Sequence, residues 1–431
     1  MRTIIILLIC LLTPSIKTHA GILFDKLSQI KQIDSITLLK NDQGFLEKYS
    51  MFFSQPVDYN NPNEGEFKQR IFVCHRGFDK PTLLVTEGYF ADFALDQNYT
   101  EELSEILQSN IIVCEHRFFS VSRPQNCNWN CLTVENSAGD YHRIISEFKK
   151  IYTGKWISSG ISKGGQTTMF YRAFYPQDVD LSVCYVSPLN KKSIDGRHEK
   201  FIKNEAGTPE LRQKVSEYQL ELFKRKKELL PYFDSLCKIN NYKFRLSTNK
   251  IFDYWILDYS FGFWQWYNDK SQIVDIKNMN NKELAEYQFK ENSPEFFQCT
   301  TPFMPFNYQS ARELGYYGFR TREFKKYMSE KSIKNYVSRI MLPEELSNVK
   351  FSKDIYKKTS KFLRTTNCNM IFIYGEYDPW SASGVFDKID FSKKDNIKIY
   401  IQPHGSHSSR INNMPPNIKT EIIDTIKKDL Q

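Results

Sequence analysis

A serine lies between two glycines in the pentapeptide GISKG at 160–164. The apolar run KWISSG at 155–160 precedes this serine, Ser162, and a helical pattern over 165–175 follows it. At a tight strand-to-helix turn, strained backbone angles lift a serine hydroxyl clear of the sheet, and small residues two positions away let the chain pass. The alternative is a turn in which small residues serve packing alone. The strand pattern before Ser162 and the helical pattern after it favour a nucleophile elbow with Ser162 as the nucleophile.

A serine hydroxyl is a weak nucleophile unless a histidine takes its proton and a carboxylate orients that histidine. In chains with such an elbow the order is serine, then acid, then histidine. Asp378, in GEYDPW, follows an apolar strand pattern and is the predicted acid, with Glu376 as the alternative. Two histidines come after it, both in QPHGSHSSRI, and we predict His407 as the base and His404 as a loop residue.

The transition state of acyl transfer carries an oxyanion, which backbone N–H groups can stabilise. The helix predicted after Ser162 directs its N-terminus at the site and places the N–H of Lys163 as one donor. A second donor normally comes from the loop after an early strand. The segment LLVTEGYF offers Gly88 and Tyr89 there, although Gly88 also suits an ordinary turn.

Strands must position these side chains, and apolar, β-branched runs occur in two blocks of the sequence. Nearly unbroken apolar runs of this length suit a parallel sheet that is covered on both faces. The predicted strands lie at 70–76, 82–88, 110–117, 155–160, 181–188, 370–378 and 397–403. Helical patterns at 137–152, at 165–175 and from about Asn417 onward separate or follow them. This alternation predicts an α/β protein with the α/β-hydrolase fold and a mostly parallel sheet.

Residues 191–350 differ from both blocks. They begin with the Lys/Glu-rich periodicity of ELRQKVSEYQLELFKRKKELL and continue through an aromatic-rich stretch to more helix. We predict that they form a helical cap, inserted between the nucleophile half and the acid and histidine half of one hydrolase domain. That domain comprises 21–190 and 351–431.

The first twenty residues have the pattern of a signal peptide: Arg2, an apolar run at 4–12, and small residues before the expected cleavage after Ala20. We therefore expect export to the periplasm or the medium. Cys10 lies within the apolar run, in a context that does not suit a lipid anchor. The aromatic stretch at 251–266 is interrupted by two aspartates, so no later segment reaches the ~18 uncharged residues of a membrane span.

The charge balance gives no sign of a nucleic-acid partner. The chain has 59 basic and 50 acidic residues, a formal net charge of +9, but the lysines are scattered and no basic tract with interleaved aromatics occurs. Cys127 and Cys131 are close enough for a local disulfide, and the second Cys or His pair that a zinc site needs is missing. Cys114 and Cys184 lie in apolar strand patterns and are predicted to be free core thiols. We expect no metal and no cofactor.

Several segments together resemble one known family: TEGY, EHRFFSVSRP, SGISKGG, FYPQDVDLSVCYVSPL, YGEYDPW and PHGSHSSRI. In this order they resemble the secreted bacterial tripeptidyl aminopeptidases of the PS-10 serine peptidase family. More distantly they resemble the prolyl carboxypeptidase and dipeptidyl peptidase II family. The resemblance implies a capped α/β-hydrolase peptidase, and its triad falls on Ser162, Asp378 and His407.

An aminopeptidase needs a carboxylate for the charged amine of its substrate. Glu313, in the cap segment YQSARELGYYG that is similar to the lysosomal family, or Glu87 could serve, although each also suits a salt-bridged or solvated acid. We expect an exported, cofactor-free serine exopeptidase that releases di- or tripeptides from the N-termini of oligopeptides through an acyl-enzyme. A carboxylesterase and an inert hydrolase-like binding protein are the rivals.

Overall fold

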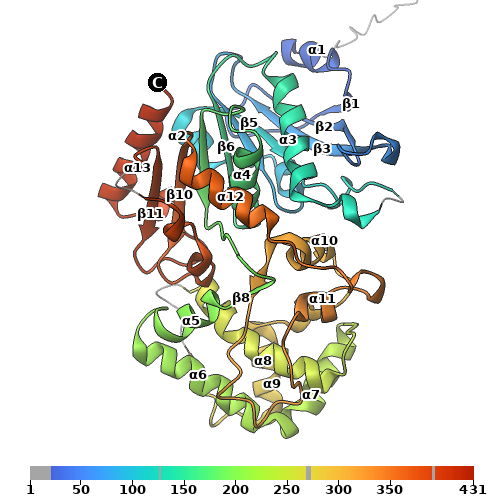
Figure 1. Cartoon of the computed structure of the whole chain (residues 1–431), viewed down its shortest axis with the longest axis vertical. Coiled ribbons are helices and arrows are strands. Elements are labelled where there is room, and N and C mark those ends of the chain that lie inside the picture. The colour runs from blue at the N-terminus through green and yellow to red at the C-terminus, as the bar shows by residue number, and fades with distance from the viewer. Residues whose placement is uncertain (1–20, 126–127, 268–272, 391–393) are drawn as a thin grey trace, which may run out of the picture.

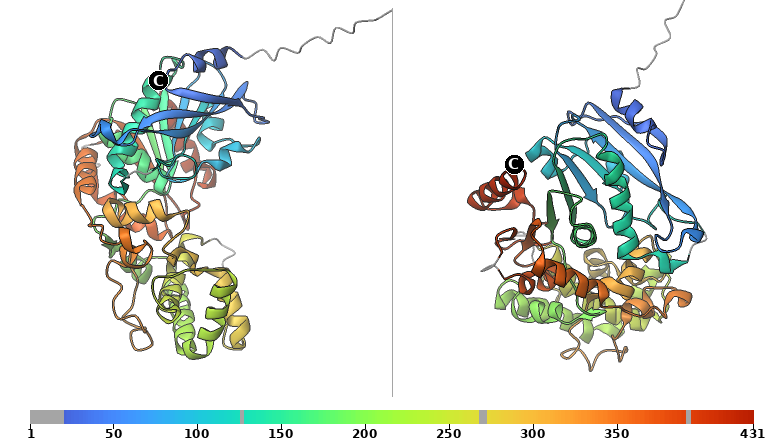
Figure 2. Two further views of the ribbon diagram at one scale, coloured as in Figure 1. Left: turned by 90° about the vertical axis from the view of Figure 1, so that its right-hand side faces the viewer. Right: turned by 45° about the horizontal axis from the view of Figure 1, so that its top comes forward.

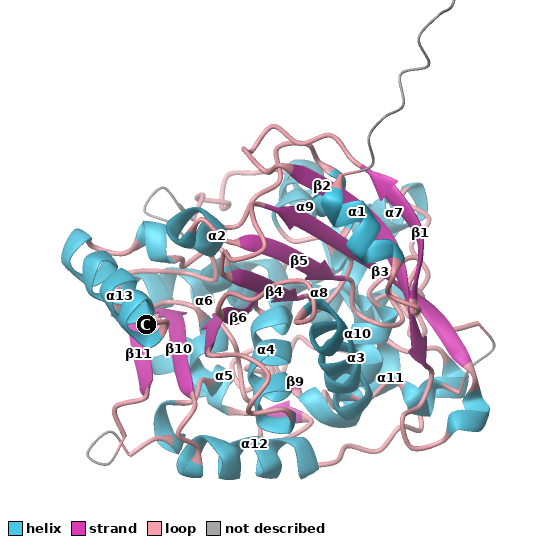
Figure 3. Cartoon of the chain, turned by 90° about the horizontal axis from the view of Figure 1, so that it is seen from above, coloured by secondary structure: helices cyan, strands magenta, loops and turns pink. Residues whose placement is uncertain are grey.

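The computed structural model describes residues 21–125, 128–267, 273–390 and 394–431. Nine strands form one sheet in the order β1-β2-β3-β5-β4-β6-β7-β10-β11, with helices on both sides of it (Figure 3). The strands are β1 (Ile33–Leu38), β2 (Glu47–Pro56), β3 (Glu66–His75), β4 (Thr82–Thr86), β5 (Asn110–Cys114), β6 (Trp156–Ile161), β7 (Leu181–Tyr185), β10 (Asn369–Gly375) and β11 (Ile397–Gln402).

The strands from β5 to β11 in this order run parallel to one another, whereas β1, β2 and β3 form an antiparallel edge. Every residue of β4, β5 and β7 is buried, which is why these strands appear in the sequence as continuous apolar runs. The predicted α/β-hydrolase fold, with its mostly parallel sheet, is confirmed.

The sequence predicted no strand before residue 70, so β1 and β2 were missed. Positions in β2 alternate between buried and half-buried along most of its length, because one face packs on the core while the other is partly open to solvent. Tyr49, Met51 and Phe53 of β2 pack with Leu23 and Leu27 of the N-terminal helix. The prediction looked for unbroken apolar runs, and an alternating edge strand does not have one.

Two layers of helices cover the sheet. The layer containing α1 (Ile22–Ser28), α3 (Val134–Phe148), α4 (Lys163–Phe174) and α12 (Asp354–Thr365) covers one face, and α2 (Glu102–Leu107) and α13 (Pro416–Asp429) cover the other. Alternate residues of β4 show the division, since Leu83 and Val85 pack with the second layer and Leu84 with the first.

A further group of helices forms a layer below the sheet domain in Figure 1, and Figure 2 shows it from two other sides. It contains α5 (Arg197–Asn204), α6 (Pro209–Lys224), α7 (Lys226–Ile239), α8 (Thr248–Gln265), α9 (Asn281–Glu291), α10 (Met304–Gln309) and α11 (Tyr336–Ile340). A short parallel ribbon pairs β8 (Ile194–Asp195), before α5, with β9 (Tyr316–Tyr317), between α10 and α11. The exact bounds predicted for the cap, 191–350, stay a prediction.

The predicted core thiols Cys114 and Cys184 are buried and free, as expected. Cys127 of the predicted disulfide with Cys131 lies outside the described residues, as does the predicted signal peptide at 1–20. Within the described part of the chain, none of the helices has both the length and the apolar character to cross a membrane.

Candidate active site

The backbone at Ser162 has the strain of a nucleophile elbow. With φ 58° and ψ −118°, Ser162 links the end of β6 to the first residue of α4, a conformation that costs free energy for a residue with a side chain. A Cβ on Gly160 would lie 2.4 Å from the backbone of Gly164, and one on Gly165 would lie 2.6 Å from the carbonyl oxygen of Tyr185. The glycines therefore serve the close passage of the chain that the sequence pattern predicted.

Asp378 and His407 lie in the loops after β10 and β11 and contact each other. Oδ2 of Asp378 is 2.7 Å from Nδ1 of His407, and both side chains are buried. Oδ1 of Asp378 accepts the backbone N–H of Trp380 at 3.0 Å. This arrangement favours the tautomer with the proton on Nδ1 and leaves Nε2 as the acceptor.

The alternative acid and the alternative histidine interact with each other instead. The backbone N–H of His404 donates to the carboxylate of Glu376 at 2.7 Å. His404 has a φ of 54°, and its ring stacks on Tyr377 with centroids 5.2 Å apart. This contact shapes the loop that leads to His407, so the geometry favours Asp378 and His407 as the working pair.

Ser162 and His407 line one cavity of about 900 Å³ between the sheet domain and the cap. Nε2 of His407 has no hydrogen-bond partner among the described residues, so the hydroxyl of Ser162 does not bond to it in this structure. Catalytic hydrogen bonds of unliganded enzymes are often long and tighten when substrate binds.

The cap contributes contacts to His407 that the sequence did not predict. The backbone N–H of His407 donates to the carbonyl oxygen of Gln265, the last residue of α8, at 2.9 Å. The ring of Trp266 meets the imidazole edge-on with centroids 5.8 Å apart, and Trp380 lies 6.3 Å away on another side. Two signals were available in the sequence: Trp380 is the last residue of the motif YGEYDPW, and Trp266 ends the aromatic stretch at 251–266.

The predicted oxyanion donors converge at the elbow. The N–H of Lys163 opens α4 and cannot donate within the helix. The side chain of Lys163 is buried, and its Nζ donates to the carbonyl oxygen of Gly88 at 2.6 Å. Burial lowers the pKa of Lys163 well below its ordinary value, against the opposing effect of Glu87 and Glu313. Lys163 thus ties the elbow to the loop that carries Gly88 and Tyr89.

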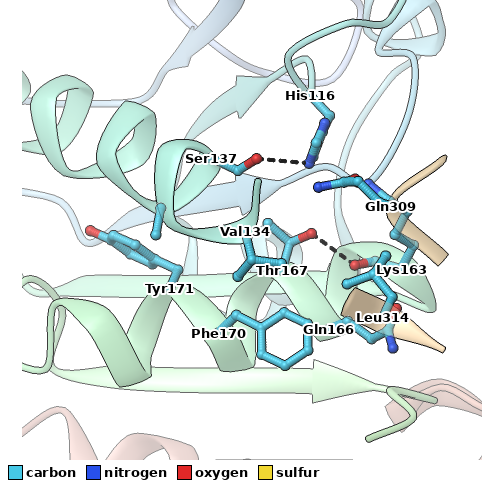
Figure 4. Close-up of a pocket in the computed structure, with 11 residues that line it drawn as sticks. His116, Val134, Ser137, Lys163, Gln166, Thr167, Phe170, Tyr171, Gln309 and Leu314 are labelled. Atoms are coloured by element: carbon cyan, nitrogen blue, oxygen red, sulfur yellow. Dashed lines mark hydrogen bonds between the residues drawn. The ribbon is translucent and has the colours of Figure 1, made fainter. Parts of the chain in front are cut away.

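Lys163 also lines a second, small cavity, whose lining does not include Ser162. Figure 4 shows its lining, in which Ser137 bonds to His116 and the hydroxyl of Thr167 donates to the carbonyl of Lys163. The carbonyl oxygen of the Gln309 side chain is buried there without a hydrogen-bond partner among the described residues.

The two acids predicted to bind the substrate occupy different places. Glu87 lines the large cavity, where its carboxylate accepts the N–H of Gly88 at 3.2 Å. Burial, reinforced by Glu101, raises the pKa of Glu87 to about 8. Glu313 is buried but does not line that cavity, and its Oε1 accepts the N–H of Val134 at the start of α3 at 2.7 Å.

The other described histidines have structural partners. His198, for example, bonds to the carbonyl of Pro379 and to Asn190, both at 2.8 Å. His75, His116 and His142 bond to Tyr152, Ser137 and Asp178. Among the described residues, no group of three or more His, Cys, Asp or Glu is arranged to hold a metal ion.

Comparison with known families shows the kind of protein in which these residues occur. Residues 22–428 match the family described as PS-10 peptidase S37. The chain belongs to the PS-10 peptidase S37 family. The serine at the elbow and the buried Asp378–His407 pair are accordingly found in a serine peptidase.

Two relatives of this S37 peptidase illustrate its range of similarity. The prolyl tri/tetrapeptidyl aminopeptidase of Streptomyces mobaraensis is 29% identical over 369 residues, which cover 84% of this chain and 75% of the relative. The lysosomal Pro-X carboxypeptidase of Mus musculus is 26% identical over 166 residues, 34% of each chain.

Solved structures similar to the S37 peptidase include VinJ and the proline iminopeptidase of Mycobacterium smegmatis. VinJ has a TM-score of 0.42 at 10% identity and covers 92% of this chain and 99% of its own. The iminopeptidase has a TM-score of 0.38 at 9% identity and covers 92% of this chain and 98% of its own.

Proposed function

We propose that the protein is an exported serine exopeptidase that releases short peptides from the N-termini of oligopeptides. The observation that carries the proposal is the buried Asp378–His407 pair, whose unpartnered Nε2 lies in the cavity that Ser162 also lines. Membership of the S37 peptidase family supports hydrolysis of peptide bonds. Export rests on the signal-peptide pattern of the first twenty residues.

In the proposed mechanism, Oγ of Ser162 attacks the scissile carbonyl carbon while Nε2 of His407 takes the hydroxyl proton. Asp378 holds Nδ1–H and stabilises the imidazolium. The oxyanion is stabilised by the N–H of Lys163 and the N–H of Tyr89. The N–H groups of Gly88 and Tyr89 both bond to the Glu87 carboxylate in this structure, so the loop supplies its oxyanion donors once that carboxylate turns away.

The tetrahedral intermediate then collapses. His407 gives its proton to the leaving amine, which departs with the remainder of the oligopeptide, and the N-terminal fragment stays esterified to Ser162. Water, deprotonated by His407, attacks this ester and releases the fragment. No cofactor is needed for either half of the reaction.

The cap supports action on chain ends. A cavity of about 900 Å³, closed on one side by the cap, is in the range that encloses small ligands, so it suits the end of a peptide and not a folded domain. The S. mobaraensis relative, named an aminopeptidase, covers most of this chain, whereas the Pro-X carboxypeptidase match covers about a third. This difference favours the N-terminus as the end that binds.

Substitution of the nucleophile tests the proposal. Wild-type protein should react with a fluorophosphonate probe and cleave a tripeptidyl anilide faster than a short acyl ester. Ser162→Ala should abolish labelling and lower kcat by roughly 10⁶-fold. Faster ester cleavage would favour the carboxylesterase, absence of labelling in the wild type would favour the inert binding protein, and full activity of Ser162→Ala would refute the mechanism.

A further inference from the structure

Most buried acids of this protein are paired with a cation. Five of the eight that are buried among the described residues form ion pairs: Glu115–Arg70, Asp140–Arg117, Asp195–Arg197, Asp253–Lys226 and Glu330–Arg339. Asp378 bonds to the imidazole of His407. Glu313 instead accepts a helix N-terminal N–H. Asp258 is the remaining one, and its surroundings differ from all the others.

Asp258 lies on α8 and has neutral hydrogen-bond partners. The hydroxyl of Tyr317 donates to its Oδ1 at 2.7 Å, and the side chain of Asn292 also bonds to it. Across the described ranges, no lysine, arginine or histidine forms an ion pair with Asp258. A buried carboxylate without a cation is costly, and burial raises the pKa of Asp258 to about 6. A cation that binds beside Asp258 would offset this cost of burial.

Asp258 is part of the wall of the cavity in which we place the substrate. Asp258 lines the same cavity as Ser162 and His407, and it is 8% exposed. The rings of Tyr259, Phe261, Phe263, Tyr316 and Tyr317 line the cavity too. An ammonium group is stabilised both by a carboxylate and by the faces of aromatic rings, so this wall of the cap is suited to a primary amine.

The position of Asp258 on its helix fixes its axial distance from the residue that holds the backbone of His407. Gln265, whose carbonyl holds the backbone of His407, follows Asp258 by two helical turns, so both residues lie on one face of α8. Seven residues at 1.5 Å rise separate them by ~10 Å along the axis. Three residues of extended peptide also span ~10 Å.

We propose that Asp258 binds the N-terminal ammonium of the substrate and, by its place on α8, sets the length of the released fragment at three residues. This inference rests on the proposed exopeptidase function. The two acids predicted from the sequence are engaged elsewhere, Glu87 with the N–H of Gly88 beside the elbow and Glu313 with the N-terminus of α3. Asp258 is the specificity-determining acid that the cap supplies.

The experiment compares a tripeptidyl anilide with a free amine, its N-acetylated counterpart, and free-amine dipeptidyl and tetrapeptidyl anilides. Wild-type protein should prefer the free-amine tripeptide. Asp258→Asn should lower kcat/KM for that substrate by about 30-fold or more, the loss expected when one partner of a buried charge pair is removed. It should leave the acetylated substrate about as before and abolish the length preference.

Two further variants separate recognition from folding. Asp234→Asn makes the same exchange on α7 of the cap, outside the cavity lining, and should keep the wild-type ratio of free to acetylated substrate. Tyr317→Phe removes the hydroxyl that orients Asp258 and should raise KM for the free-amine tripeptide about tenfold with kcat unchanged. Fluorophosphonate labelling of Ser162 should persist in all three variants, which shows that the fold is intact.

The outcomes distinguish this inference from the function on which it rests. A wild-type protein that prefers the free amine, together with an Asp258→Asn protein that keeps this preference, overturns the role of Asp258 alone. Equal loss on free and acetylated substrates also overturns it, because a carboxylate that binds the amine cannot affect a substrate that lacks the charge. A wild-type protein that labels but cleaves both substrates equally overturns the N-terminal exopeptidase as well.

Discussion

The sheet domain and the cap fill their interiors in different ways. In the sheet domain aliphatic strands dominate, and buried acids have charged or imidazole partners, as in Arg117–Asp140, whose guanidinium donates to both carboxylate oxygens at 2.6 and 2.7 Å. The cap interior is aromatic, with Trp255 stacked on Phe233 at 4.5 Å, and on its cavity side it leaves Asp258 without a cation.

This difference shows how the two regions divide the work. The acid and the base that we assign to bond cleavage, Asp378 and His407, already bond to each other before substrate arrives, so their mutual orientation does not depend on it. The cap pairs a buried acid that does not line the cavity, Asp253 with Lys226, whereas its buried acid in the cavity wall, Asp258, has no cation among the described residues. The carboxylate of Asp258 can therefore attract a cationic ligand that enters the cavity.

The largest effect is expected when the contact between Asp378 and His407 in the sheet domain is altered. Asp378→Asn should lower kcat by roughly 10⁴-fold, because the histidine then adopts the wrong tautomer, while the unfolding midpoint changes little. Steady-state kinetics with a peptidyl anilide measures this. Glu376→Gln is the matched control and should keep kcat near the wild-type value; a larger loss in the control would transfer the role of the acid to Glu376.

A substitution in the aromatic interior of the cap should show how much this interior contributes to the free energy of unfolding. Trp255 is fully buried in the cap, and its indole N–H donates to the carbonyl of Asn292. Trp255→Ala should lower the free energy of unfolding by about 3–5 kcal/mol, as measured by urea denaturation. Trp266→Ala changes the same residue type at a position that is 60% exposed and should cost at most about 0.5 kcal/mol. Similar losses would mean that the cap core is not close-packed.

The smallest effect is expected at Glu313, whose pKa burial raises from 4.5 to about 7. The folded protein then holds a proton that the unfolded chain has lost, so this residue makes stability fall as pH rises from about 4.5 to 7. Glu313→Gln should flatten that fall in urea denaturation across this range. It should leave the ratio of free to acetylated substrate unchanged; a collapse of that ratio would make Glu313 the amine-binding acid.

The sequence was sufficient where local pattern and chain order carry the information. The elbow at Ser162 was visible because glycines and flanking elements mark it. Chain order selected Asp378 and His407, which contact each other, and the catalytic roles of the three residues stay a prediction. The parallel strands were visible as apolar runs. The first two antiparallel strands, β1 and β2, were not, because their burial depends on contacts with α1 that no local pattern records.

Asp258 shows why part of the site could not be predicted. The sequence shows Asp258 only as a charged residue within an aromatic stretch, where it argues against a membrane span. Its hydrogen bond joins it to Tyr317, 59 residues away, and its access to the cavity depends on which face of α8 turns toward the sheet. Neither fact is encoded within a few residues of Asp258.

The bond between the carbonyl of Gln265 and the backbone N–H of His407 has a consequence for the timing of turnover. A displacement of α8 by little more than the length of one hydrogen bond would release the loop of the general base. The position of the base that we propose therefore depends on the cap as well as on the sheet domain.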